Sequence, residues 1–295
     1  MKDCCPMPSC CGPYFLKIVL DYALRTGILL EGGGRISASV QPGDVFLASI
    51  VYGAMSKFKF RRVLSVVRYI IPTIRFNFHY LPFRQAVKLP ILLYKPRLLN
   101  LSGTVSIEGP VHTGMIKLGF EYARLYPNAG IQFENGGGKL IFEGKAQISA
   151  SSFVSIGKYG CLRLGDDFVN NAQLRIACYH SITVGKRTMF GYDTMMMDSN
   201  FHRLKNEAGE FVNTGVAPIV IGNYNWIATR CMVMPGAHTQ DYTIVAANSL
   251  INRTIDESKV IVAGSPATIK KRGIWRDMED DQIDFEAIAA AQNQA

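Results

Sequence analysis

Residues 221–251 read IGNYNWIATRCMVMPGAHTQDYTIVAANSLI, and this stretch decides the fold. Within it an aliphatic residue or a threonine recurs at every sixth position, at Ile221, Ile227, Val233, Thr239, Val245 and Ile251. Small residues follow several of these positions, as in Gly222 and Ala228. A period of six matches neither the helical repeat of about 3.6 residues nor a single alternating strand. It is typical of short strands joined by tight corners, and it therefore predicts a stacked β-helix.

The six-residue spacing extends upstream and is then interrupted. Val105 and Val111 are six residues apart, and a longer series follows with two shifts of two residues. Its members are Ile156, Leu162, Phe168, Leu174, Ile176, Ile182, Val184, Phe190 and Met196. Residues 201–218 are rich in polar residues and glycine, so we expect a loop that leaves the coil wall. Residues 260–272, VIVAGSPATIKKR, are expected to close the coils with a glycine-proline turn.

Composition narrows the class of protein but does not choose its function. The chain has 295 residues, of which 48% are hydrophobic and 19% charged, as in a folded protein. Its net charge of +9 suits nucleic acid, an anionic membrane surface or a phosphorylated cofactor. An odd number of cysteines, seven, favours a reducing compartment. The N-terminus lacks the order of a signal peptide, and apolar runs are shorter than the ~18 residues of a membrane span. We therefore expect a cytoplasmic protein.

A basic segment precedes the repeats. From Val45 to Ile107 the chain has no acidic residue. The same span holds ten basic residues: Lys57, Lys59, Arg61, Arg62, Arg68, Arg75, Arg84, Lys88, Lys95 and Arg97. Interleaved apolar residues predict a basic amphipathic helix that ends before Pro72. Two interpretations of residues 57–97 are open. The helix docks on the body with its cations in solvent, or it contacts the inner face of an anionic membrane or a lipid-linked substrate. No nucleic-acid module accompanies the charge.

The repeat region carries several short motifs of a known family. The segments I-G-N-Y-N-W-I-A-T-R, M-P-G-A, V-A-A-N-S and V-A-G-S-P-A-T-I-K-K resemble the hexapeptide-repeat acyltransferases. Within that superfamily the chain is most similar to the O-acetyltransferases of bacterial surface-polysaccharide synthesis. The resemblance implies a mainly β fold, a left-handed parallel β-helix over residues 100–272 that is usually trimeric. Residues 1–99 would form an N-terminal helical extension, and residues 273–295 an acidic tail with a short helix.

The resemblance also implies an active site that uses acetyl-CoA and one essential histidine. His202, at the edge of the interrupting loop, matches that histidine. A neutral imidazole with a pKa near ~6.5 can remove the proton of an acceptor hydroxyl as the acyl bond forms. Asp198 is a candidate to orient the imidazole. Asn171 falls near an acceptor-contact position of the family, but Tyr179 replaces the neighbouring acidic residue, which leaves the acceptor open.

The donor would be held by small residues and by cations. Gly191, Thr229 and Ala247 match positions where the family lets CoA run along the coil wall. Arg253, Lys270 and Lys271 are candidates to bind its phosphates. Each of these cations also fits a solvated surface that balances the acidic tail. No metal site is expected, because the histidines lack the close-paired spacing of metal ligands.

We therefore predict an acetyl-CoA-dependent O-acetyltransferase that modifies a sugar hydroxyl in a capsule, exopolysaccharide or lipopolysaccharide pathway. The expected partners are a sugar or glycan acceptor, lipid-linked or free, and two further copies of the chain in a homotrimer. One alternative is N-acetylation of a nucleotide-linked amino sugar or acetylation of a small xenobiotic. Another is a non-catalytic β-helix scaffold.

Overall fold

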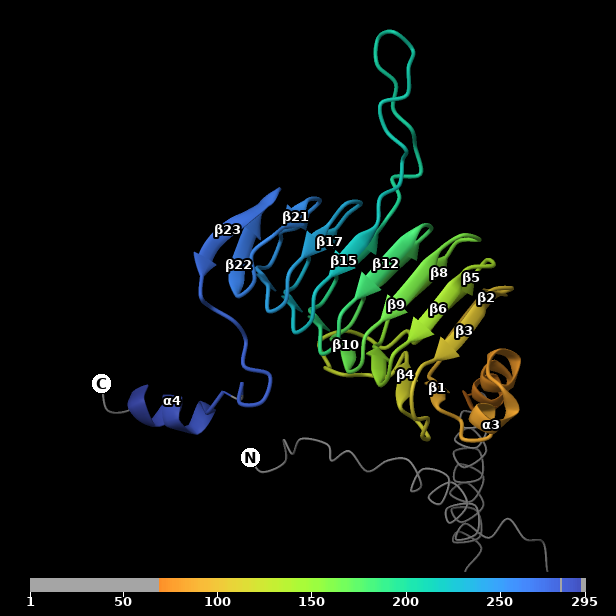
Figure 1. The fold of residues 1–295 in the computed structure, drawn as a ribbon. Coiled ribbons are helices and arrows are strands. Elements are labelled where there is room, and N and C mark those ends of the chain that lie inside the picture. Colours follow the sequence, from red (N-terminus) through yellow and green to blue (C-terminus); the bar gives the residue numbers. More distant parts are fainter. Residues whose placement is uncertain (1–68, 282, 293–295) are drawn as a thin grey trace, which may run out of the picture.

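The computed structural model describes residues 69–281 and 283–292 (Figure 1). The predictions made for residues 1–68 lie outside the described residues. They include most of the basic helix and the greater part of the N-terminal helical extension. The described chain begins in helical residues 69–80, continues in α3 (Phe83–Ala86) and ends in α4 (Phe285–Gln292).

Between these ends the described strands form three sheets of nine, seven and seven members. Sheet A contains β1 (Ile91–Leu93), β4 (Ile116–Leu118), β7 (Ala146–Ile148), β10 (Phe168–Asn170), β13 (Met189–Phe190), β16 (Trp226–Ile227), β19 (Ile244–Val245), β22 (Val260–Gly264) and β23 (Ala267–Arg272). Sheet B contains β2 (Pro96–Leu101), β5 (Ile131–Asn135), β8 (Ser152–Ile156), β11 (Arg175–Cys178), β14 (Met195–Met197), β17 (Met232–Val233) and β20 (Leu250–Ile251). Sheet C contains β3 (Thr104–Ile107), β6 (Lys139–Phe142), β9 (Cys161–Leu164), β12 (Ser181–Val184), β15 (Ile219–Ile221), β18 (His238–Thr239) and β21 (Thr254–Ile255).

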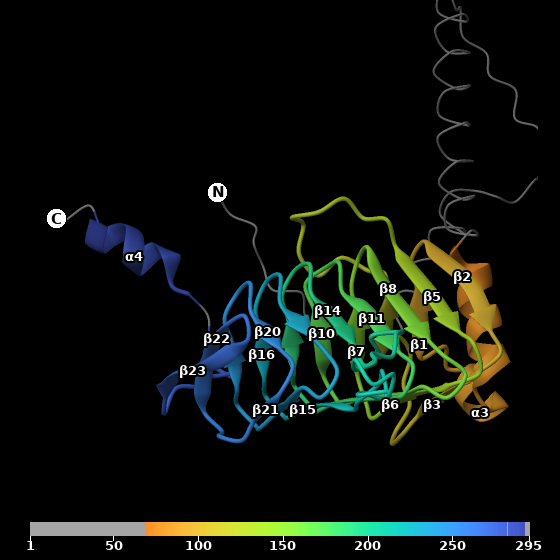
Figure 2. The ribbon, with the colours of Figure 1, turned by 90° about the horizontal axis from the view of Figure 1, so that it is seen from above.

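Up to β22 the chain visits sheets A, B and C in turn, and each strand from β1 to β19 pairs in parallel with the strand three places further on. This arrangement is the predicted left-handed parallel β-helix (Figures 1 and 2). We name the three columns of corners by the sheets they join: the AB corner, the BC corner and the CA corner.

The six-residue positions of residues 221–251 form the core of the last coils, as predicted. Ile221, Ile227, Val233, Thr239, Val245 and Ile251 are all 0–1% exposed. Each is the last residue of its strand, and in β16 to β20 it is the single buried side chain that the strand adds to the interior. Trp226 pairs with Ile244, so one turn takes 18 residues there. Leu162 pairs with Ile182, a turn of 20 residues, and the two extra residues account for the shifts seen in the sequence.

The N-terminal end of the coils is closed by helical residues 69–80, which run through Pro72. The prediction of a helix ending before Pro72 is therefore wrong. Contacts beyond the proline hold the helix on the coils. The Asn77 amide donates to the Ile91 carbonyl at 2.7 Å, and its oxygen accepts the Ile91 N–H at 3.1 Å. Phe76 is 1% exposed against Phe133. This packing outweighs the local preference of proline to end a helix.

The C-terminal end follows the prediction of a closing turn and a short helix. β22 and β23 form an antiparallel hairpin at Gly264 that ends sheet A. Residues 274–281 then pass along the outside of sheet A, where Arg276 contacts Trp226 and Met189. α4 follows and lies away from the coils in both views (Figures 1 and 2). No helix within the described ranges is long and apolar enough to cross a membrane.

Candidate active site

Residues 200–218 leave the coils at the BC corner, between β14 and β15, and form a long ribbon (Figure 1). Two antiparallel bridges hold it, Ser199 to Val216 at the root and Lys205 to Phe211 near the tip. The Arg203 guanidinium lies 3.4 Å from the centroid of the Phe211 ring, a close cation–π contact. The predicted departure from the coil wall is therefore present, and this departing segment is internally paired.

Asp198 anchors the root of the ribbon. It is fully buried, and its two carboxylate oxygens accept the backbone N–H groups of Tyr179 and His180, each at 2.8 Å. These bonds tie the start of the ribbon to the corner of the preceding coil. Burial and the Asp198 carboxylate raise the pKa of the neighbouring Cys178 thiol. Within the described chain no hydrogen bond joins Asp198 to His202, so Asp198 acts on the ribbon through backbone groups.

His202 lies three residues beyond the first bridge residue of the ribbon, and its side chain is exposed. Phe201 precedes it in the left-handed backbone region, with φ of +57°, and donates its N–H to Ser199 Oγ at 3.0 Å. Gly215 lies opposite with φ of +80°, and a Cβ there would come within 3.1 Å of the His202 carbonyl oxygen. The backbone around His202 is thus closely held, while its imidazole makes no hydrogen bond within the residues described.

A polar and aromatic cluster lies at the BC-corner edge of sheet B, beside the ribbon. The Ser155 hydroxyl lies 3.1 Å from both Glu134 Oε2 and the Tyr179 hydroxyl. The Tyr179 ring covers Gly157, where any side chain would overlap it. The rings of Tyr179 and Phe201 meet edge to face with centroids 4.8 Å apart. Carboxylate, hydroxyl and aromatic groups therefore gather beside Phe201, the residue that precedes His202.

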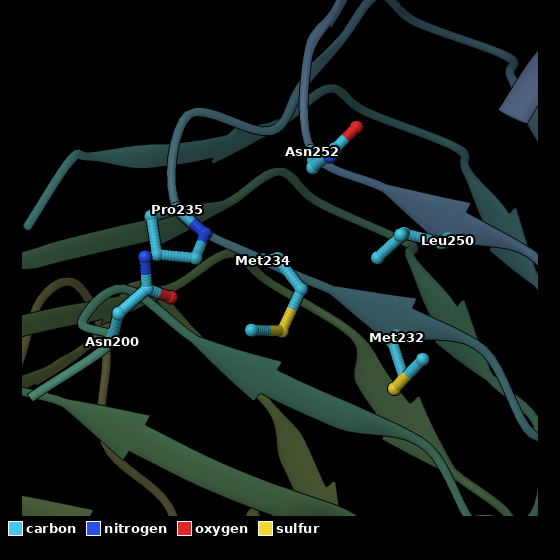
Figure 3. Close-up of a pocket in the computed structure, with 6 residues that line it drawn as sticks. All are labelled: Asn200, Met232, Met234, Pro235, Leu250 and Asn252. Atoms are coloured by element: carbon cyan, nitrogen blue, oxygen red, sulfur yellow. The ribbon is translucent and has the colours of Figure 1, made fainter. Parts of the chain in front are cut away.

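A groove crosses the outer face of sheet B on the other side of the ribbon (Figure 3). Its lining comes from the ribbon root and from two coils: Asn200, Met232, Met234, Pro235, Leu250 and Asn252. None of these residues was predicted from the sequence, although a signal existed. Met232 and Met234 flank the buried Val233, and Leu250 precedes the buried Ile251. Strand alternation therefore pointed to an apolar outer face.

Three residues predicted to contact CoA stack in one column at the AB corner. A Cβ on Gly191 would lie 2.7 Å from the Thr229 nitrogen, and the Thr229 carbonyl accepts the N–H of Asn248, which follows Ala247, at 3.0 Å. Asn171 lies in the same column, one coil before Gly191, and its N–H donates to the Phe190 carbonyl at 2.9 Å. Its Oδ1 is buried without a hydrogen-bond donor within the described residues.

The structure separates the other predicted residues. Asn171 and Tyr179 lie at opposite edges of sheet B, with β11 between them. Arg253 is exposed at the BC corner, next to the groove residue Asn252. Lys270 and Lys271 are exposed on β23 of sheet A. One chain alone therefore gathers the small-residue column but not the predicted cations.

No family model matches the chain. A putative lipopolysaccharide biosynthesis O-acetyl transferase, WbbJ of Escherichia coli, is 28% identical over 122 residues, which cover 38% of this chain and 61% of that protein. The galactoside O-acetyltransferase of Escherichia coli is 24% identical over 108 residues, 37% of this chain and 52% of that protein. A probable macrolide acetyltransferase of Lysinibacillus sphaericus is 40% identical over 67 residues, 22% of this chain and 34% of that protein.

All three relatives are named as acetyltransferases. The chain resembles them, as its repeats predict. It spans about half to three-fifths of the length of the first two. Among solved structures, the polySia specific acetyltransferase NeuO superposes with a TM-score of 0.44 at 16% identity, covering 68% of this chain and 99% of that one. A hexapeptide-repeat containing acetyltransferase of Vibrio cholerae, complexed with acetyl coenzyme A, gives a TM-score of 0.30 at 14% identity, covering 68% and 82%.

Proposed function

We propose that the chain is an acetyl-CoA-dependent O-acetyltransferase that modifies a sugar hydroxyl, with His202 as general base. One observation carries the proposal. His202, the only histidine on the described ribbon, lies at one edge of sheet B, and the opposite edge carries the column of small residues. The curated relatives of the chain are named as acetyltransferases. The surface-polysaccharide pathway is proposed from the names of two relatives, which concern lipopolysaccharide and colanic acid biosynthesis.

The proposed reaction is one direct transfer. The acceptor oxygen attacks the thioester carbonyl, the carbon–sulfur bond breaks, and His202 passes the hydroxyl proton to the departing thiolate. Cys178 and Cys231 are unsuitable as acyl carriers, because burial raises the pKa of both thiols and keeps them protonated. The small side chains at Gly191, Thr229 and Ala247 permit close approach of the donor, and the groove offers an apolar wall beside it.

We propose that a second copy of the chain completes each site, within a homotrimer. Asn171 and the Gly191–Thr229–Ala247 column occupy the AB corner, whereas His202 occupies the BC corner. A neighbour that presents its AB corner to the ribbon brings the two sets together. Light scattering on the purified full chain tests this arrangement. A monomer that retains full activity would rule it out.

His202→Ala is the decisive variant. Removing a general base lowers kcat by about 10²–10⁴-fold. Because the side chain is exposed, the melting temperature should stay unchanged. The assay follows thiol release from acetyl-CoA with a panel of neutral and acidic sugars. His180→Ala is the matched control, because His180 is also exposed at the BC corner but lies off the ribbon. A wild-type chain that neither binds CoA nor turns over any acceptor would favour the scaffold alternative.

We propose that the acceptor sugar lies against Tyr179 and Phe201, with Glu134 at the end of the hydroxyl chain. Tyr179→Phe removes one hydroxyl and keeps the ring on Gly157. We expect the acceptor KM to rise several-fold while the acetyl-CoA KM is unchanged, since a hydrogen bond contributes about 0.5–1.5 kcal/mol. Tyr242→Phe, at a tyrosine on the CA corner between β18 and β19, should change neither constant.

A second candidate is acetylation of a small xenobiotic. It is favoured by the 40% identity to the probable macrolide acetyltransferase, although that match covers only 67 residues. Including macrolides in the acceptor panel separates the two. A macrolide kcat/KM above that of every sugar would make xenobiotic acetylation the first candidate function.

A further inference from the structure

We propose that the N-terminal end of the coils docks on an anionic lipid bilayer surface. The docking surface, here called the end-cap face, combines exposed apolar side chains with unpaired arginines. Its members are Ile71, Ile74, Arg75, Phe78, Phe83, Arg84 and Val87. The proposal stands apart from the acetyltransferase activity, because none of these residues belongs to the candidate active site.

The apolar members of the end-cap face form one continuous surface. On the helix, Ile71, Ile74 and Phe78 are spaced by three, four and seven residues, so they share one stripe. They are 51%, 40% and 46% exposed. The opposite stripe, with Phe76 and Asn77, is buried on the coils. The side chains that hold the helix in place are therefore distinct from the ones it displays.

The surface continues onto α3 through an aromatic contact. The rings of Phe78 and Phe83 meet edge to face with centroids 6.0 Å apart. Phe83 is 73% exposed and Val87, four residues later, is 50% exposed. Five large apolar side chains in contact with solvent at one end of a molecule are more than scattered surface hydrophobics, and such a patch marks an interaction site.

The charge of this end identifies the partner. Arg75 and Arg84 are exposed and form no ion pair in the described part of the chain. No acidic residue occurs from Val45 to Ile107 to oppose them. A surface that inserts aromatic and aliphatic side chains between lipid headgroups, with arginines level with the phosphates, fits an anionic bilayer. A protein partner with an acidic rim would also match the arginines. The bilayer is the simpler partner, because its acyl chains bury the phenylalanines as well.

Vesicle flotation of the full chain tests the proposal. We use phosphatidylcholine vesicles with and without phosphatidylglycerol, at low and at high salt. We expect association with the anionic vesicles that salt weakens. Each basic residue at an anionic surface contributes about 1 kcal/mol, so Arg75→Gln with Arg84→Gln should lower partitioning about thirtyfold. Phe78→Ser with Phe83→Ser should lower it at least as much, because the apolar insertion is lost.

Two controls keep the test specific. Lys139→Gln with Lys145→Gln removes the same charge from exposed positions elsewhere on the coils and should leave partitioning nearly unchanged. Circular dichroism melting checks that the phenylalanine variant is folded, and the arginine variant provides an answer if it is not. The proposal is overturned if the wild type does not float with anionic vesicles, or if patch and control variants lose the same affinity. It is equally overturned if the patch variants change only the oligomeric state, which would make this end an interface between copies.

Discussion

The last coils and the ribbon that interrupts them are adjacent in sequence but follow opposite rules. From Ile221 to Ile251 each strand buries its six-residue position, and the interior is continuous. Residues 200–212 are all exposed, and the ribbon holds its shape by bridges and cation–π contacts. The coils therefore supply the stability, and the ribbon presents His202 at little cost to the fold. Substitutions that affect one region and spare the other test this division.

The largest effect is expected inside the coils. Ile227→Ala removes a fully buried side chain and leaves a cavity between β13 and β19, so the free energy of unfolding should fall by about 2–5 kcal/mol. Leu204→Ala on the ribbon, where the side chain is 58% exposed, should change it by less than about 0.5 kcal/mol. Chemical denaturation of both variants measures the difference. Equal losses would mean that the ribbon is part of the cooperative core.

The next effect is expected where the two regions join. Asp198→Asn keeps the size of the side chain but replaces one of two acceptors with a donor that faces a backbone N–H. We expect a loss of about 1–3 kcal/mol in unfolding free energy, together with lower activity as the ribbon root moves. Asp193→Asn, at an ion pair with Arg175 on the surface, is the control and should cost less than about 1 kcal/mol. An unaltered fold with normal activity would show that Asp198 does not position the ribbon.

The contrast between the coils and the ribbon also explains how much of the fold the sequence predicts. Burial at Ile227 or Val233 repeats with the coil, so periodicity alone predicts the architecture and locates the interruption. The partners of Asp198 are 18 and 19 residues away, and they become neighbours only because that coil takes 20 residues. The helix through Pro72 depends on the hydrogen bond of the Asn77 side chain with Ile91. This bond joins two separate segments, so local helix propensity does not predict it.

The candidate site was predictable in its parts rather than in its assembly. Motif position selected Gly191, Thr229 and Ala247, and the coil register brings them into one column. The cluster of Glu134, Ser155 and Tyr179 comes from three successive coils, so its members are more than 20 residues apart in sequence. Only the register of sheet B makes them adjacent.

A smaller effect on stability is expected from a buried thiol of the coils as pH rises. The pKa of Cys178 lies above its usual 9.0, because burial and the nearby Asp198 disfavour the thiolate. Above pH 9 the unfolded chain loses this proton while the folded chain keeps it, so stability falls as pH rises. The loss is at most about 1.4 kcal/mol per pH unit for one thiol. Chemical denaturation at several pH values between 8 and 10 measures this loss. The unfolding free energy should fall less with pH for Cys178→Ala than for the wild type, and an equal fall would contradict the role assigned to this thiol.

The smallest effect is expected on the outside of sheet A, where residues 274–281 add a contact that the coils do not need. Arg276 lies 5.7 Å from the Trp226 ring centroid and pairs with Asp281, and Trp226 is 38% exposed. A cation–π contact at such a site contributes about 0.5–1 kcal/mol. In a Trp275→Phe background, which leaves Trp226 as the only tryptophan of the chain, Arg276→Gln should therefore cost no more than about 1 kcal/mol of stability, yet shift the emission to longer wavelength as Trp226 meets more water. Arg272→Gln, which breaks an exposed pair with Glu257, should leave the emission unchanged. If both variants shift the emission alike, the segment is held by something other than Arg276. If neither does, Trp226 is shielded by the coil itself, and the regular wall extends to its outer face.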